Sequence, residues 1–141
     1  MSAETNSQRQ APPTIFLVEE DDDARPILTR NLRQHGYRLL VAATLEDAHE
    51  WIGGESRVNA DLVLIDLVGR TPEEAVRLGR ELREYAKYDG RTPLVVLPEK
   101  IPRDLEGTNV NVGENDWICY YDDESSQLRT LLARMLDKSS A

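Results

Sequence analysis

Five short apolar runs, spaced along a chain of 141 residues, constrain the fold more than any other feature of the sequence. They cover residues 15–18, 39–42, 62–65, 94–97 and 117–121. Four of them are aliphatic at nearly every position and do not alternate with polar residues. This pattern is typical of strands in a parallel sheet that helices cover on both faces. The length of the chain suits one compact domain built on such a sheet.

The segments between these runs carry apolar residues at helical spacing. The clearest stripe lies near the C-terminus and consists of Leu128, Leu131, Leu132, Met135 and Leu136. Strands that alternate with helices predict an α/β class with right-handed crossovers. The predicted fold is a doubly wound five-stranded parallel sheet, flavodoxin-like, of order 2-1-3-4-5.

One interval departs from this alternation. Residues 99–116 include Pro102, Gly107 and Gly113 and offer few good helix formers in succession. The fourth helix is therefore expected to be short, irregular or missing.

Composition narrows the function classes. A net charge of −9 works against binding of polyanions such as nucleic acid or anionic lipid. Cys119 is the only cysteine, which excludes an internal disulfide, and we expect it to be a buried core residue. No apolar run is long enough to span a bilayer. Residues 1–13 are polar, which predicts a disordered tail. We expect a folded domain over residues 14–138. The tail has no apolar segment typical of a secretion signal, so we expect a cytoplasmic protein.

Carboxylates gather where two strands of the predicted sheet end. Glu19, Glu20 and Asp21 follow the first run, and Asp66 follows the third. In a sheet of order 2-1-3-4-5 these two strands are neighbours, and ligands bind in the crevice at their carboxyl ends. Clustered carboxylates repel one another, and a hard divalent cation relieves the repulsion. We therefore expect a site for Mg²⁺ and a phosphoryl group here, while residues 21–23 serve as turn and helix-cap residues.

Two segments carry a family resemblance. The run Ile15-Phe-Leu-Val-Glu-Glu-Asp-Asp-Asp-Ala-Arg25 resembles the start of response-regulator receiver domains, where a strand ends in an acidic pair and an arginine follows. The stretch Ala60-Asp-Leu-Val-Leu-Ile-Asp66-Leu67 is similar to the family's strand that ends in the phosphoacceptor aspartate. The resemblance covers roughly residues 14–136 and is weak between residues 99 and 116.

The resemblance implies a signalling domain of a two-component phosphorelay. Asp66 would accept phosphate from a phosphohistidine or a small phosphodonor. Glu20 would bind Mg²⁺ directly, Glu19 would act through water, and the carbonyl of Val68 would complete the metal site. The partners would be a histidine kinase or phosphotransfer protein, a downstream signalling protein, or both. No enzymatic turnover of its own is expected, because apart from the acceptor Asp66 these acids stabilise charge during an in-line phosphoryl transfer and supply no base for turnover.

The sequence also departs from the family pattern. Receivers end the fourth strand in Thr or Ser and the fifth in Lys, whereas Pro98 and Tyr120 stand here. Pro98 has neither a hydroxyl nor an N–H, and Tyr120 has no fixed positive charge. Trp117 replaces a Tyr or Phe that changes rotamer in the family, and we expect it to stay packed. These departures predict an atypical or pseudo-receiver that acts through protein–protein contacts.

Three alternatives follow from the same residues. The first is an adaptor that never depends on phosphorylation. The second is a flavodoxin-like cofactor-binding protein, although residues 19–21 would repel the phosphate of a flavin nucleotide. The third is a phosphohydrolase with an aspartyl nucleophile, which would need a second acid where Val68 stands.

Overall fold

A computed structural model describes residues 11–53, 59–88, 91–122 and 126–140 of the chain. Of the tail predicted over residues 1–13, residues 1–10 lie outside the described residues. No helix in the described part of the chain is long and apolar enough to cross a membrane.

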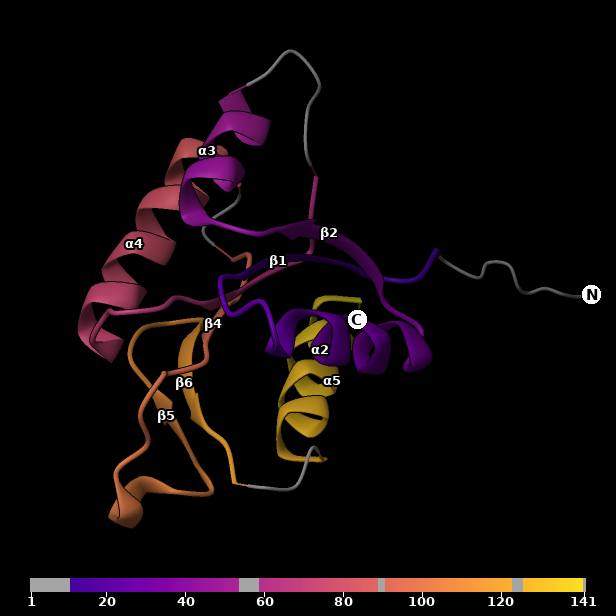
Figure 1. Cartoon of the computed structure of the whole chain (residues 1–141). Helices are drawn as coiled ribbons and strands as arrows, with labels where there is room; N and C mark the ends of the chain where they lie inside the picture. The colour runs from indigo at the N-terminus through magenta and orange to yellow at the C-terminus, as the bar shows by residue number, and fades with distance from the viewer. Residues whose placement is uncertain (1–10, 54–58, 89–90, 123–125, 141) are drawn as a thin grey trace, which may run out of the picture.

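The five predicted strands form the parallel part of one sheet (Figure 1). They are β1 (Thr14–Glu19), β2 (Arg38–Ala42), β3 (Leu62–Asp66), β4 (Leu94–Val96) and β6 (Asp116–Tyr120). Their order is β2-β1-β3-β4-β6, which confirms the doubly wound fold and places β1 beside β3.

A sixth strand, β5 (Thr108–Asn111), was not predicted and corrects the expected count of five. It pairs antiparallel with β6 at the edge of the sheet, with Val110 opposite Ile118. The interval from β4 to β5 has only one short 3-10 helix, η1 (Arg103–Leu105), so the expectation of a short, irregular or missing helix is confirmed. The β-branched Thr108 and Val110 favour a strand, and Gly107 supplies the positive φ of 85° that starts it.

In the described part of the chain, helices cover the sheet in two layers (Figure 1). One layer contains α2 (Ala24–Gln34) and α5 (Ser126–Ser140), and the other contains α3 (Leu45–Gly53) and α4 (Pro72–Tyr85). The start of α4 is a capping box, in which the Thr71 hydroxyl accepts the Glu74 N–H and the Glu74 carboxylate accepts the Thr71 N–H.

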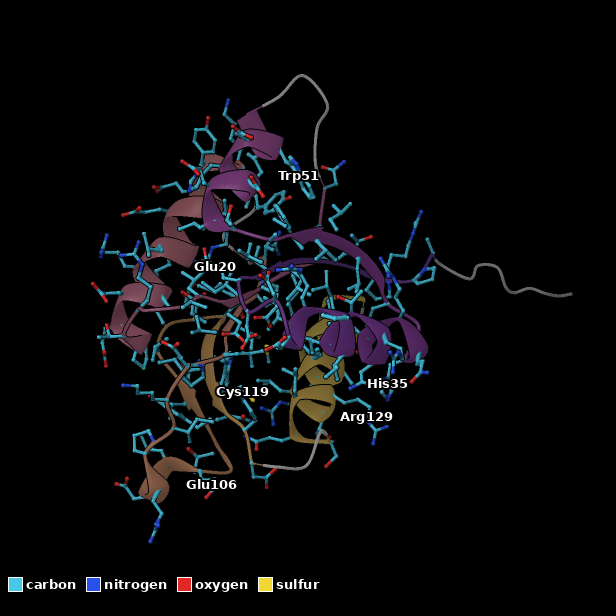
Figure 2. The ribbon with its side chains drawn as sticks, viewed as in Figure 1. Glu20, His35, Trp51, Glu106, Cys119 and Arg129 are labelled. Atoms are coloured by element: carbon cyan, nitrogen blue, oxygen red, sulfur yellow. The ribbon has the colours of Figure 1, made fainter. Side chains whose placement is uncertain are left out.

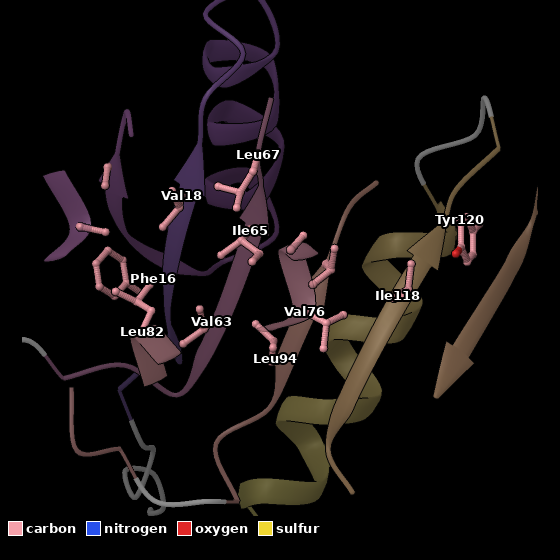
Figure 3. Packing of buried hydrophobic residues seen from close by; sticks show 14 residues of the cluster. Phe16, Val18, Val63, Ile65, Leu67, Val76, Leu82, Leu94, Ile118 and Tyr120 are labelled. Atoms are coloured by element: carbon pink, nitrogen blue, oxygen red, sulfur yellow. The ribbon is translucent and has the colours of Figure 1, made fainter. Parts of the chain in front are cut away.

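Alternation along each strand divides the core between the two layers. Phe16 and Val18 face α3 and α4, where their cluster also contains Tyr120 (Figure 3). Ile15 and Leu17 face α2 and α5, in the cluster that contains Cys119. Cys119 is buried as predicted, and burial raises its pKa to about 11, so the thiol stays protonated. The same alternation carries the next residue after Val18, Glu19, onto the α2 and α5 face.

A buried ion cluster joins α4 to the start of β6. The carboxylate of Asp116 accepts hydrogen bonds from Arg80 Nε at 2.7 Å and from Arg83 Nη1 at 2.6 Å. Arg80 Nη2 also donates to the Val112 carbonyl at 2.7 Å, which fixes the turn between β5 and β6. The edge hairpin is thus held against the helix layer by charge as well as by apolar packing.

Candidate functional site

The carboxyl ends of β1 and β3 bring Glu19 and Asp66 side by side. The two residues are partners in the parallel register, and both point to the α2 and α5 face of the sheet. They line a cavity of about 210 Å³ together with Asn31 and Tyr121. The remaining lining residues are mostly apolar: Ala24, Ile27 and Leu28 from α2, and Leu97 from the end of β4. Among the residues that the structure describes, no lysine or arginine lines this cavity.

Glu19 and Asp66 form a carboxyl pair that favours one shared proton. Burial, and then the charge of Asp66, raise the pKa of Glu19 to about 9. Burial also raises the pKa of Asp66 to about 6, and Asp21, Glu99 and Glu20 add to the effect, although the hydrogen bond from Glu19 opposes it. If both groups were ionised, neither could donate a hydrogen bond, and the buried Glu19 Oε1 would have no partner. A proton on Glu19 lets it donate to Asp66, so near pH 7 the pair is one acid and one carboxylate.

Glu20, labelled in Figure 2, ties the loop after β3 to the start of α3. Its Oε1 accepts the Val68 N–H at 3.0 Å, and its Oε2 accepts the Leu45 N–H at 3.0 Å. Nearby, Glu99 Oε1 accepts the Gly69 N–H at 2.9 Å. The loop between β3 and α4 is therefore held by carboxylates from two other loops.

The other acids after β1 have local structural roles. Asp21 Oδ1 accepts the N–H groups of Asp23 and Ala24 at 2.9 and 3.2 Å. Asp23 occupies the N-cap position of α2, as expected for residues 21–23, but the side chain that accepts the N–H groups there is that of Asp21. Arg25 Nη1 donates to the Glu19 carbonyl at 2.9 Å and fixes the end of β1.

The donor set at this site suits a hard cation. Glu19 and Asp66 present two carboxyl groups, which would both be carboxylates once a cation displaces the shared proton, and the buried Glu19 Oε1 has no protein donor. Mg²⁺ commonly takes one or two carboxylates and keeps several waters. Among the described residues no three His, Cys, Asp or Glu side chains are gathered as a ready metal cluster. Glu20 binds two N–H groups, and its predicted role as a direct ligand, with that of the Val68 carbonyl, stays a prediction.

Solved structures resemble this fold over nearly its whole length. No family model and no curated protein matches the chain. A response regulator receiver protein from Sinorhizobium medicae matches with a TM-score of 0.65 and 19% identity, covering 89% of this chain and 95% of that one. The chemotaxis protein CheY4 of Vibrio cholerae matches with a TM-score of 0.64 and 17% identity, covering 89% and 100%. The chain has the receiver-domain fold.

A third structure with this receiver fold bears on the metal. The receiver domain of a sensor histidine kinase from Pseudomonas aeruginosa matches with a TM-score of 0.59 and 24% identity, covering 90% of this chain and 99% of that one. That structure has a magnesium ion coordinated in its active-site cleft.

The positions that depart from the receiver pattern lie in different surroundings. Pro98 is buried just beyond β4. Tyr120 is buried in the cluster on the α3 and α4 face of the sheet, opposite to the face that carries Asp66. Trp117 is half-buried in the α2 and α5 cluster, and the Arg134 guanidinium carbon lies 5.5 Å from its ring centroid. Lys100 and Arg70, which could have supplied a charge, are exposed and do not line the cavity.

Sequence reasoning missed the two polar residues that complete the cavity. Tyr121, the last residue of the fifth apolar run, reaches the acid pair where Tyr120 does not. Burial, then the charges of Asp66 and Glu19, raise the pKa of Tyr121, so its hydroxyl remains a donor. Strand alternation from Cys119 could have indicated this side. Asn31 lies on α2, and nothing in the sequence pattern of that helix indicated that its side chain would line the cavity.

Proposed function

We propose that the chain is a receiver-like signalling domain of a two-component phosphorelay, with Asp66 as phosphoacceptor, and that it acts through protein–protein contacts. The observation that carries the proposal is the carboxylate of Asp66 at the end of β3, paired with Glu19 in a cavity on a receiver fold. Asp66 would take the phosphoryl group as its own P–O bond forms and the donor's P–N or P–O bond breaks. The domain would be cytoplasmic, with no catalytic turnover of its own.

Mg²⁺ would be held by Asp66 and Glu19, with Glu20 and the Val68 carbonyl as the further ligands that the family resemblance implies. Bound there, the cation would supply positive charge to the transferring phosphoryl group. The chain's own residues orient the acceptor. Before the cation binds, Glu19 holds the Asp66 carboxylate by a hydrogen bond, and the buried Leu97 limits water on one side of it.

At the ends of β4 and β6 the cavity beside Asp66 is lined by Leu97 and Tyr121 and not by Pro98 and Tyr120. Neither lining residue supplies an ammonium, and the lack of that charge supports weak coupling between phosphorylation and conformation. A receiver of this kind is an atypical one, in which the bound state changes little beyond the acceptor. Its partners would be a histidine kinase or phosphotransfer protein upstream, a signalling protein downstream, or both. The runner-up is an adaptor that binds its partner whether or not Asp66 is modified.

Incubation with acetyl phosphate and Mg²⁺, followed by intact-mass spectrometry, tests the phosphoacceptor. We expect one phosphoryl adduct on the wild type and none on Asp66→Asn. Asp104→Asn, which makes the same chemical change at an exposed position, should keep the adduct. A wild type that gains no adduct, while an active receiver in the same buffer does, would contradict the phosphoacceptor role and favour the adaptor.

Three further measurements separate the alternatives. Beryllofluoride with Mg²⁺ should shift amide resonances near Asp66 but not along β6, and large shifts along β6 would contradict impaired switching. Affinity capture from the native host with wild type and Asp66→Ala, with the captured protein identified by mass spectrometry, tests the adaptor. Equal capture of the same partner supports it. A flavin absorbance band in the purified protein would support the cofactor-binding alternative.

A further inference from the structure

Backbone N–H groups of the loop between β3 and α4 are already bound by carboxylates of this chain. The Val68 N–H donates to Glu20 at 3.0 Å, and the Gly69 N–H donates to Glu99 at 2.9 Å. Gly69 has a φ of 77°, a left-handed turn conformation that presents consecutive N–H groups together. N–H groups at this edge of an α/β sheet are the donors that anionic ligands use.

We propose that the carboxylates of Glu20 and Glu99 occupy the anion-binding N–H groups of this loop. An anion or phosphoryl group that arrives at Asp66 must therefore compete with them for the Val68 and Gly69 N–H groups. The choice of a phosphoryl group as the competing ligand rests on the proposed function. The occupation of the N–H groups does not.

The two glutamates differ in how firmly they are held. Glu20 is half-buried, and its second oxygen binds the Leu45 N–H at 3.0 Å, so it ties the start of α3 to the loop. Glu20 uses a different carboxylate oxygen for each bond, an arrangement that an amide with one acceptor oxygen does not reproduce. Glu99 is exposed and makes one such bond. Glu99 is therefore the carboxylate that an incoming anion displaces first.

This arrangement fixes the loop before any ligand binds. In the absence of a phosphoryl group, charge-assisted hydrogen bonds already hold both N–H groups. A ligand then gains little by binding them, because it replaces two existing bonds, and it also meets the negative charge of Glu99. The loop is thus held in one conformation in the unmodified protein, which fits a domain whose surface changes little on modification.

Amide hydrogen exchange tests the occupation without any ligand. We expect the Gly69 amide to exchange about tenfold faster or more in Glu99→Ala, since loss of one charge-assisted bond of about 1.4 kcal/mol corresponds to that factor. Glu20→Gln, which leaves one oxygen acceptor, should speed exchange at Val68 or Leu45. Glu106→Ala is the matched control, because Glu106 is also exposed and Figure 2 shows it well apart from Glu20. Unchanged Gly69 exchange in Glu99→Ala would overturn the proposal.

Titration with beryllofluoride and Mg²⁺, followed through the same amides, tests the competition. Glu99→Ala should bind about tenfold tighter than the wild type, whereas Glu106→Ala should not. Glu99→Gln keeps an acceptor oxygen without the charge, and an intermediate affinity is expected. Equal affinity in all variants refutes the competition alone, and no binding in any variant refutes it together with the phosphoacceptor role. Tighter binding by Glu99→Ala, with no acetyl phosphate adduct on the wild type, supports the competition and contradicts only the proposed function.

Discussion

Replacement of Asp116 should destabilise the fold strongly, because this carboxylate is the centre of the ion cluster between α4 and β6. Asp116 is 4% exposed and accepts three hydrogen bonds, one from Arg80 and two from Arg83. Removal of one partner from a buried ion pair costs about 3–5 kcal/mol. The Arg83 side chain is only 14% exposed and cannot turn fully into water, whereas Arg80 is 43% exposed and can. We therefore expect Asp116→Asn to lose about 3 kcal/mol, the lower end of that range.

Urea denaturation followed by far-UV circular dichroism measures this loss. With a slope of about 2 kcal/mol per M, a loss of about 3 kcal/mol lowers the midpoint by about 1.5 M. Asp104→Asn, with the same charge change at an exposed position, should leave the midpoint nearly unchanged. If the two variants shift the midpoint equally, the ion cluster does not stabilise the fold and the reasoning fails.

The same residue gives the stability a pH dependence. Burial alone would raise the pKa of Asp116, but the hydrogen bonds from Arg83 and Arg80 outweigh it, so the net pKa is lowered. A carboxyl whose folded-state pKa is lowered contributes stability that is present above its ordinary pKa of 3.8 and lost as the pH falls below it. Wild type should therefore lose more stability than Asp116→Asn when the pH is lowered from 5 to 3, as urea midpoints at the two pH values will report.

Three further perturbations have defined outcomes. The pKa of Glu19 is raised from 4.5 to about 9, so wild-type stability should fall as the pH rises across that interval, and Glu19→Gln should be the more stable protein in urea at pH 8. A urea midpoint for Glu19→Gln below that of the wild type at pH 8 would show that Glu19 and Asp66 do not share a proton. In Gly79→Ala the new Cβ would lie 2.8 Å from Leu94 Cδ1, and overpacking of about 1–3 kcal/mol should exceed the helix-propensity gain of about 1 kcal/mol. A higher melting temperature for this variant would mean that the neighbouring core side chains rearrange to accept the new methyl group. Thr71→Ala should cost about 1 kcal/mol by removing the capping box of α4, and a change in urea midpoint no larger than that of an exposed Thr→Ala replacement would contradict the capping contribution.

The sequence alone determined the doubly wound sheet and the position of its acids. Unbroken aliphatic runs can be buried only between two helix layers, and the spacing of the runs leaves room for helices between them. Asp66 follows directly after such a run, so its place at the carboxyl end of β3 followed from the strand itself. The irregular stretch before β6 was also predictable, because Pro102, Gly107 and Gly113 disfavour a helix there.

Only the tertiary structure decided what each acid binds. The two glutamates after β1 are neighbours in sequence, yet Glu19 is buried beside Asp66 while Glu20 binds the N–H groups of Leu45 and Val68. These partners lie on other loops, and no local pattern specifies which loops meet at the sheet edge. The same holds for β5, whose pairing with β6 depends on a turn closed by long-range contacts to α4. Local residue types fix strands and helices, but bonds between distant loops fix the chemistry of the carboxylates.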